Sequence, residues 1–234
     1  MQCQFSFVHL RSVFQLLNSS GYQSCLLTEA LTAVPPKPAV ILRHDLDQVL
    51  ENALVLASME HEYGLKATFF VWLESPFYNP FEPSQAEIIR QIIRLDHALG
   101  LHLEVDPARL ADLPEKVRMQ SEILESFFAA SCQSVSFHRP APKLLQQEPL
   151  ISQRINAYAP ALLESYKYVS DSRGKWREGC VCKLVKPDEF PYLYLLLHPL
   201  WWGDEDLKPK QRVEAYQQQK TRQLTAECQS HIWD

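Results

Sequence analysis

The sequence predicts an α/β protein built around a mainly parallel sheet. Apolar runs of strand length alternate with helix-periodic segments along most of the 234 residues. The runs are continuously apolar, as in strands that are covered on both faces. Their ends follow one another at intervals of about 25 to 36 residues, close to the roughly 30 residues of a β-α-β unit. The length fits one large domain.

The first 34 residues are expected to form a helical segment packed on the body of the protein. Apolar side chains recur at helical spacing from Phe7 to Leu17, which predicts a helix with one buried face. The PPKP sequence at 35–38 marks a boundary. We therefore divide the chain into a helical segment, 1–34, and a main domain, 35–234.

Two buried strands open the main domain. AVILRHDLD at 39–47 begins apolar and ends in charged residues, which indicates a parallel strand that emerges at its carboxyl end. KATFFVWL at 66–73 is a second such run. Residues 52–64 between them show helical periodicity up to Gly64, which fits a helix C-cap.

The remaining elements continue this alternation. Ser84 and Glu87 form a capping-box pattern before a helix that we expect to end at Gly100. Further helices are expected at 115–130 and 144–166. Strands are expected at 101–105, 134–140, 167–172 and 192–199.

The composition excludes several functional classes. The 6 glycines are too widely spaced for a G-x-G-x-x-G or P-loop motif, so a nucleotide-binding α/β enzyme is not expected. A net charge of −5 without a basic run disfavours nucleic acid as a partner. No apolar stretch approaches the roughly 20 residues of a membrane span, and the N-terminus lacks a secretory-signal pattern. We therefore expect a cytoplasmic protein.

Cysteines and several histidines are interpreted as structural. The 6 cysteines are scattered along the chain, which fits reduced thiols in a reducing compartment. Cys180 and Cys182 have the wrong spacing for a zinc ribbon, and Cys132 is expected to fill the core. Four histidines are expected to be hydrogen-bonded structural residues: His9, His61, His97 and His231.

Polar residues stand at the ends of most predicted strands. Because the carboxyl ends of parallel strands meet at one edge, these side chains are expected to share a site. Carboxylates and imidazoles there fit a divalent metal that activates water for hydrolysis. Asp45 and Asp47 point to the same side of an extended segment, so one can bind metal while the other acts as a base. The full set is Asp45, Asp47, His102, His138, Asp171 and His198.

An ordered set of short motifs resembles the polysaccharide deacetylase family, the NodB-homology or carbohydrate esterase family 4 proteins. The motifs are RHDLD at 43–47, KATFF at 66–70, GLH at 100–102, HRP at 138–140, SDSRGKW at 170–176 and LLHP at 196–199. The resemblance covers about residues 39–203. It implies that residues 35–234 form a distorted, incomplete (β/α) barrel, and that the reaction is metal-dependent hydrolysis of an N- or O-acetyl group on a sugar polymer.

The resemblance implies a divalent metal ion, with zinc first and cobalt or nickel as alternatives. Asp47 matches the family's metal-binding aspartate, and His102 matches the first histidine of its H-x-x-x-H motif. The position of the second histidine holds Asp106. The third ligand therefore stays open among Asp106, His138 and Glu104.

The resemblance also assigns residues for proton transfer and substrate binding. Asp45 matches the catalytic base, and Arg139 matches the arginine that holds the carboxylate of the base. His198 matches the acid that protonates the leaving amine, and Asp171 matches the aspartate that orients it. Aromatic surfaces for a sugar ring are expected from Trp176, Trp201 and Trp202.

We therefore expect a metal-dependent deacetylase that removes an acetyl group from an N-acetylated sugar or polysaccharide. One alternative is a non-catalytic carbohydrate-binding relative, which would explain the missing second histidine. Another is an allantoinase-like amidohydrolase that acts on small non-peptide C–N compounds, which would fit the lack of a secretory signal. The sequence leaves the oligomeric state open.

Overall fold

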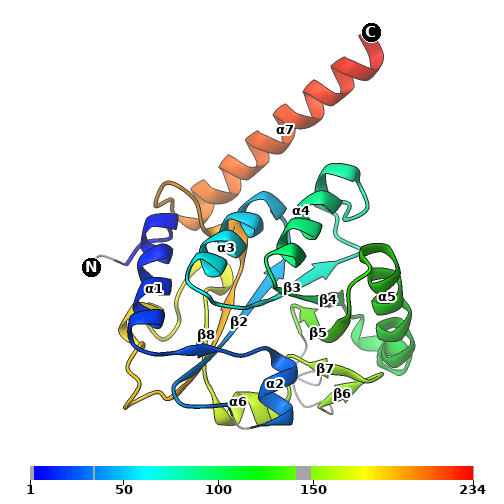
Figure 1. Ribbon diagram of the computed structural model, residues 1–234. Coiled ribbons are helices and arrows are strands. Elements are labelled where there is room, and N and C mark those ends of the chain that lie inside the picture. The colour runs from blue at the N-terminus through cyan, green and yellow to red at the C-terminus, as the bar shows by residue number, and fades with distance from the viewer. Residues whose placement is uncertain (1–2, 34, 141–148, 234) are drawn as a thin grey trace.

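The computed structural model describes the backbone of residues 3–33, 35–140 and 149–233 (Figure 1). Its centre is one curled sheet in which the strands follow the order β6-β7-β5-β4-β3-β2-β9-β8, with β1 beside β2. All pairings are parallel except that of β6 with β7. The strands are β1 (Gln23–Ser24), β2 (Ala39–Leu46), β3 (Thr68–Trp72), β4 (Ala98–Glu104), β5 (Cys132–His138), β6 (Leu150–Ile151), β7 (Arg154–Asn156), β8 (Lys167–Ser170) and β9 (Tyr192–Leu197).

Helices flank the curled sheet, so that the whole is an incomplete (β/α) barrel (Figure 1). The predicted fold class is therefore confirmed. The α-helices are α1 (Phe7–Ser19), α2 (Leu27–Thr32), α3 (Leu50–Glu62), α4 (Pro83–Arg94), α5 (Leu113–Phe128), α6 (Pro160–Ser165) and α7 (Pro209–Trp233). Four of the short 3-10 helices are η1 (Pro107–Asp112), η3 (Ser172–Gly174), η4 (Val181–Lys183) and η5 (Pro199–Trp201).

Strand β2 runs through the centre of the sheet, and all eight of its residues are buried. Its side chains alternate between two packing regions, as the pleat of a strand requires. Val40 and Leu42 belong to the large apolar cluster beneath the helices, whereas Ile41 packs in a smaller cluster with Phe70 and Tyr194. The odd-numbered face therefore points into the curl of the sheet, and it carries the polar residues that follow.

The N-terminal helix α1 presents its apolar stripe to the core. Leu10, Val13, Phe14 and Leu17 are fully buried, and Ser6 caps the helix by accepting a hydrogen bond from the His9 amide. The stripe matches the periodicity that predicted a helix here. The division of the chain at residue 34 stays a prediction.

Two predicted helix boundaries are wrong. The helix expected to run to Gly100 ends at Arg94, and Gly100 lies inside strand β4. Its N-cap is Glu82, whose carboxylate accepts hydrogen bonds from the Ser84 and Gln85 amides. The capping box expected at Ser84 therefore does not form, because Pro83 has already begun the helix.

The helix expected over 144–166 is mostly absent from the part of that range that the structure describes, which begins at residue 149. Strands β6 and β7 form a short antiparallel pair there, and only Pro160–Ser165 is helical. Residues 144–148 lie outside the described residues.

Helix α7 was not predicted from the sequence, and it extends away from the body of the protein (Figure 1). The described side chains of residues 221–230 are all exposed. Within the described residues, no helix combines the length and apolar character that crossing a membrane requires.

Two of the histidines that were expected to be structural make hydrogen bonds to the backbone. The His97 ring accepts from the Ala67 amide and lies 2.9 Å from the Ala57 carbonyl oxygen. His61 Nδ1 lies 3.1 Å from the Leu95 carbonyl oxygen. The side chain of His231 lies outside the described residues.

Candidate active site

Three of the predicted site residues meet at the carboxyl ends of β2, β4 and β5. Asp47 Oδ1 lies 3.0 Å from His102 Nε2 and 3.4 Å from His138 Nδ1. One ligand atom from each residue lies within 4.8 Å of the other two. Parallel strands place their carboxyl ends at the same edge, so a site assembled from three separate segments follows from the topology.

This cluster fits a divalent metal ion. Asp47 Oδ1 and His102 Nε2 are buried, yet neither forms a hydrogen bond of acceptable geometry with the residues described. Buried polar atoms without partners are rare, and an ion between them would satisfy both. Burial alone would raise the pKa of Asp47, but the imidazoles of His102 and His138 outweigh it and lower that pKa well below its usual range. The carboxylate is therefore charged and available as a ligand.

Ser136 orients the His102 ring. Its hydroxyl lies 2.6 Å from His102 Nδ1 and donates to Asp45 Oδ1 at 3.4 Å. A hydroxyl that donates to the carboxylate accepts from Nδ1–H, which leaves the Nε2 lone pair facing Asp47. Sequence reasoning missed Ser136, although its place two residues before His138 in β5 puts both side chains on the same face of the strand.

His138 is held by aromatic packing. Its ring stacks on Trp72 with 4.5 Å between centroids, and Trp72 also meets His102 edge to face at 6.0 Å. Trp72 is buried in the core, as predicted for the KATFFVW segment. One indole therefore fixes both imidazoles of the cluster.

The two other candidates for the third ligand lie elsewhere. Asp106 is exposed, and its carboxylate caps η1 by accepting from the Ala108 amide at 2.9 Å. Glu104 is exposed at the end of β4. The cluster contains His138 and neither carboxylate.

Arg43, and not Arg139, holds the carboxylate of Asp45. Its Nε and Nη2 donate to the two oxygens of Asp45 at 2.8 and 2.7 Å. Both side chains are almost fully buried. Burial raises the pKa of Asp45, but Arg43, together with His102 and His198, outweighs that effect and the pKa falls below its usual value. Arg139 is instead exposed at the end of β5, with a positive φ of 46° that turns the chain away from the strand.

Sequence reasoning missed Arg43 because its side chain was not distinguished from other charged strand-end residues. The signal was available, since Arg43, Asp45 and Asp47 are spaced by two along one strand and so share a face. The guanidinium also lies over the Tyr158 ring, 4.3 Å from its centroid, and donates to the Tyr158 hydroxyl at 2.8 Å. These contacts fix its orientation in the curl of the sheet.

His198 and Asp171 form a second polar pair beside the cluster. His198 Nδ1 lies 2.6 Å from Asp171 Oδ1, and the His198 amide donates to the same carboxylate at 3.0 Å. Trp202 Nε1 donates to Asp171 Oδ2 at 2.9 Å. Burial lowers the pKa of His198, but the charge and hydrogen bond of Asp171 and the smaller contributions of Asp47 and Asp45 together outweigh it, and the pKa rises to about 9. The imidazole is therefore protonated at neutral pH.

The three predicted tryptophans lie in different environments. Trp202 is fully buried and supports Asp171, so it offers no surface to a sugar ring. Trp176 is partly buried and stacks on Phe5 with 5.7 Å between ring centroids. Only Trp201 lines the cavity beside the site. Trp176 and Trp202 therefore do not line the cavity as expected. Phe5 of the N-terminal segment packs against both rings, a contact that the sequence did not indicate.

A cavity of about 1110 Å³ opens over these groups. Asp45, Asp47, His102, His138 and His198 all contribute to its lining. The volume is ample for a small ligand. The arrangement joins a cluster of residues that could hold a metal ion, an ionised carboxylate and a protonated imidazole in one space, and metal-assisted hydrolysis of an acyl group uses such groups.

A solved structure from the family 4 carbohydrate esterases shares this curled, mainly parallel fold. The mutant of a CE4 family pseudoenzyme with restored enzymatic activity aligns with a TM-score of 0.50 and 12% identity, over 80% of this chain and 65% of that one. The agreement confirms the resemblance drawn from the motifs at the level of the fold.

Two further structures of this class also align with the chain. A family 4 carbohydrate esterase from Bacillus anthracis gives a TM-score of 0.47 at 13% identity, over 89% of this chain and 84% of that one. The wild-type CE4 family pseudoenzyme from Bacillus anthracis gives 0.47 at 12% identity, over 79% and 62%. No protein-family model matches the sequence, and no curated protein matches it.

Proposed function

We propose that the protein is a metal-dependent hydrolase that removes an acetyl group from an N-acetylated sugar or polysaccharide. The observation that carries the proposal is the meeting of three units in one cavity: the cluster of Asp47, His102 and His138, the Arg43-held Asp45, and the Asp171-held His198. Each unit alone has structural explanations. Their common opening into one space supports catalysis.

Asp47, His102 and His138 are the residues that would hold the metal. One carboxylate and two imidazoles suit zinc, and they also suit cobalt or nickel. When bound, such an ion polarises a carbonyl oxygen and makes water a better nucleophile near neutral pH. The acetyl carbonyl of the substrate would therefore lie next to this cluster.

Asp45 and His198 would move the protons. Asp45 is ionised and accepts a proton from the attacking water, and His198 is protonated and donates one to the nitrogen as its bond to the acetyl carbon breaks. The products are acetate and a free amine. Arg43 keeps Asp45 charged and pointed into the cavity, and Asp171 does the same for the imidazolium of His198.

Acetate release from N-acetylglucosamine oligomers tests the proposal. We expect activity that needs added zinc, cobalt or nickel, and a loss of about 10²–10⁴-fold in His198→Ala, the range for removing a general acid. Metal content measured by elemental analysis should fall in His138→Ala. Asp106→Ala is the matched control and should change neither value. A protein that takes up no metal and releases no acetate would leave a non-catalytic relative as the better account.

A small acidic amide is a second candidate substrate. Arg139, Arg173 and Arg177 line the same cavity and are exposed, so a carboxylate on the substrate would find guanidinium partners. The test compares acetate release from neutral sugar oligomers with hydrolysis of small ureido and amido acids. Hydrolysis of only the acidic amides, lost in Arg173→Ala, would favour this candidate.

We further propose that the protein works in a reducing compartment such as the cytoplasm. Six cysteines are free, and one of them is exposed, which fits an environment that keeps thiols reduced.

A further inference from the structure

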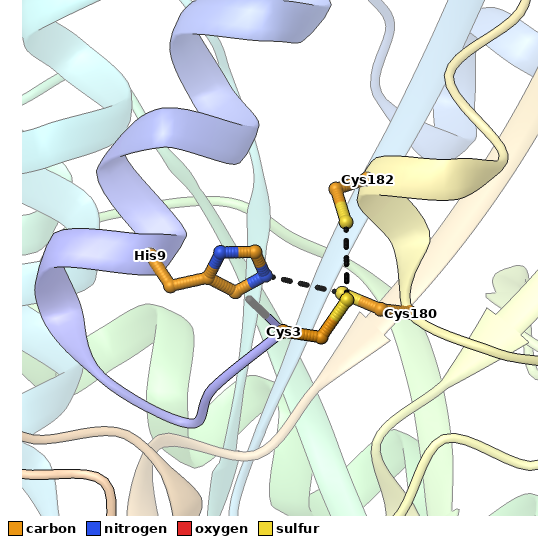
Figure 2. Close-up of side chains that lie close together, drawn as sticks. All are labelled: Cys3, His9, Cys180 and Cys182. Atoms are coloured by element: carbon orange, nitrogen blue, oxygen red, sulfur yellow. Dashed lines mark hydrogen bonds between the residues drawn. The ribbon is translucent and has the colours of Figure 1, made fainter. Parts of the chain in front are cut away.

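A second cluster of metal-ligating side chains lies outside the candidate active site. Cys3, His9, Cys180 and Cys182 converge so that one donor atom from each lies within 4.8 Å of the others (Figure 2). Cys3 Sγ lies 3.5 Å from Cys182 Sγ, and His9 Nε2 lies 3.1 Å from Cys180 Sγ. None of these residues contributes to the proposed acyl hydrolysis.

The four side chains come from two distant parts of the chain. Cys3 precedes helix α1, and His9 lies in its first turn. Cys180 and Cys182 lie at the start of the 3-10 helix η4. Figure 2 shows the His9 ring and the three sulfur atoms pointing toward one another from these two segments. The cluster could not be predicted from the sequence, because Cys3 and His9 lie more than 170 positions away from Cys180 and Cys182.

The distances match four ligands of one ion better than they match other cysteine chemistry. A disulfide needs sulfur atoms about 2.0 Å apart, and the cysteines here are free. Donors that are each about 2.1–2.3 Å from a tetrahedral zinc ion lie roughly 3.5–3.8 Å from one another. The observed 3.5 Å and 3.1 Å approach those values. Cys180 and His9 are buried, whereas Cys3 and Cys182 are more accessible, so the cluster lies at the edge of the core.

We propose that Cys3, His9, Cys180 and Cys182 form a structural zinc site of the Cys₃His type. Three thiolates and one imidazole fill a tetrahedral coordination sphere, which leaves no open position for water or substrate. The site therefore differs in kind from the cluster at Asp47. Thiolate sulfur favours zinc over the harder ions that oxygen ligands select.

The ion would fix the N-terminal segment against the residues that support His198. Phe5, between Cys3 and His9, stacks on Trp176 and packs against Trp202 at a centroid distance of 5.1 Å. Trp202 in turn donates to Asp171. Zinc at the cluster would fix the segment that carries Phe5, and so support the aspartate that orients the imidazole.

The experiment measures metal stoichiometry while the other site is disabled. Asp47→Ala removes a ligand of the candidate active site, so zinc that remains reports on the cysteine cluster. We expect about one zinc per chain in Asp47→Ala, with roughly three sulfur neighbours near 2.3 Å by zinc X-ray absorption. Adding Cys180→Ser or Cys3→Ser should reduce this zinc to a small fraction. Cys228→Ser, which changes an exposed cysteine of α7, is the matched control and should keep it.

Either of two outcomes would contradict the proposed zinc site. One is an Asp47→Ala protein that binds no zinc at micromolar concentrations while its cysteines titrate as free thiols. The other is zinc bound with only nitrogen and oxygen neighbours. X-ray absorption is measured on the Asp47→Ala protein, which keeps all four residues of the cluster. The result therefore does not depend on whether the cysteine variants fold. Acetate release is not part of the readout, so failure of the proposed deacetylase activity leaves this test unaffected.

Discussion

Two charged side chains of the candidate active site, Asp45 and His198, each have one main partner of opposite charge. Asp45 is held by Arg43 and His198 by Asp171, and in both cases this partner is the largest contribution that opposes the effect of burial on the pKa. Buried pairs of this kind depend on both members, because removing one leaves the other charge without compensation. The pairs therefore link the chemistry of the site to the stability of the protein.

Replacing Arg43 should destabilise the fold strongly. Arg43→Met leaves the Asp45 carboxylate buried without its partner, and we expect the free energy of unfolding to fall by about 3–5 kcal/mol. Urea denaturation followed by circular dichroism measures the change. Lys66→Met, which breaks an exposed pair with Asp96, is the control and should cost no more than about 1 kcal/mol. Equal losses in the two variants would contradict the importance assigned to Arg43.

Replacing Asp171 should shift the titration of His198. With Asp171 present the pKa of His198 is about 9, so the acid form declines as pH rises through that value. Asp171→Asn removes the main charge that opposes burial, so the pKa should fall and the alkaline limb of the pH–activity profile should move to lower pH. NMR titration of the His198 ring measures the same shift without activity. An unchanged ring titration would contradict the pairing, and Asp112→Asn serves as an exposed control.

At the scale of elements, the strands were easier to predict than the helix ends. Continuous apolar runs identified β2, β3 and β9, because burial on both faces leaves a strong signal. Gly100 misled the prediction, since a glycine after a periodic segment usually ends a helix. In the structure Gly100 pairs with Phe70 across β3 and β4. Its role is to make room for that ring, which no local pattern reveals.

Gly100→Ala should therefore destabilise the sheet. A Cβ atom there would lie 2.5 Å from Phe70 Cδ1, inside contact distance. We expect a loss of about 1–3 kcal/mol, typical of overpacking in a core. The double variant Gly100→Ala/Phe70→Leu should lose less than the two single changes combined, because the smaller side chain removes the clash. Additive losses in thermal or urea unfolding would show that Phe70 is not the obstacle.

The sequence predicted those residues of the candidate site that stand at the ends of strands. Asp47, His102 and His138 could be named because each follows an apolar run, and topology brings such ends together. Asp106 and Arg139 were assigned by resemblance, but Asp106 caps η1, and Arg139 lines the cavity without holding Asp45. The Cys3 cluster could not be found by spacing, because its members approach only after the N-terminal segment packs on the loop before β9.

At the scale of the whole molecule, helix α7 stands apart from the barrel. Tyr216 of α7 contacts the body through its hydroxyl, which lies 3.5 Å from the Phe77 carbonyl oxygen. Arg212 donates to the carbonyls of Phe5 and Glu205. The first turns of α7 therefore belong to the structure of the barrel, and residues 221–230 face solvent.

Deleting residues 222–234 should leave the barrel intact. The exposed part of α7 contributes little buried surface, so we expect the free energy of unfolding to change by no more than about 0.5 kcal/mol. Arg212→Ala should cost more, because it removes hydrogen bonds to two carbonyls. Thermal unfolding of both variants tests the contrast. A large loss in the truncated protein would mean that the outer part of α7 packs on something, such as another copy of the chain.

The contact of Phe5 with Trp202 can form only after the chain has been synthesised as far as Trp202. The Phe5 amide also donates to Asp206, and the Phe7 amide donates to the Gly203 carbonyl. Protein synthesis proceeds from the N-terminus, so the N-terminal segment cannot complete these contacts until the residues near 206 have been made. A ribosome-bound chain that has not yet exposed Asp206 therefore lacks the complete support of His198. The proposed activity therefore depends on contacts between residues 201 positions apart in the chain, which form only once Asp206 has been made.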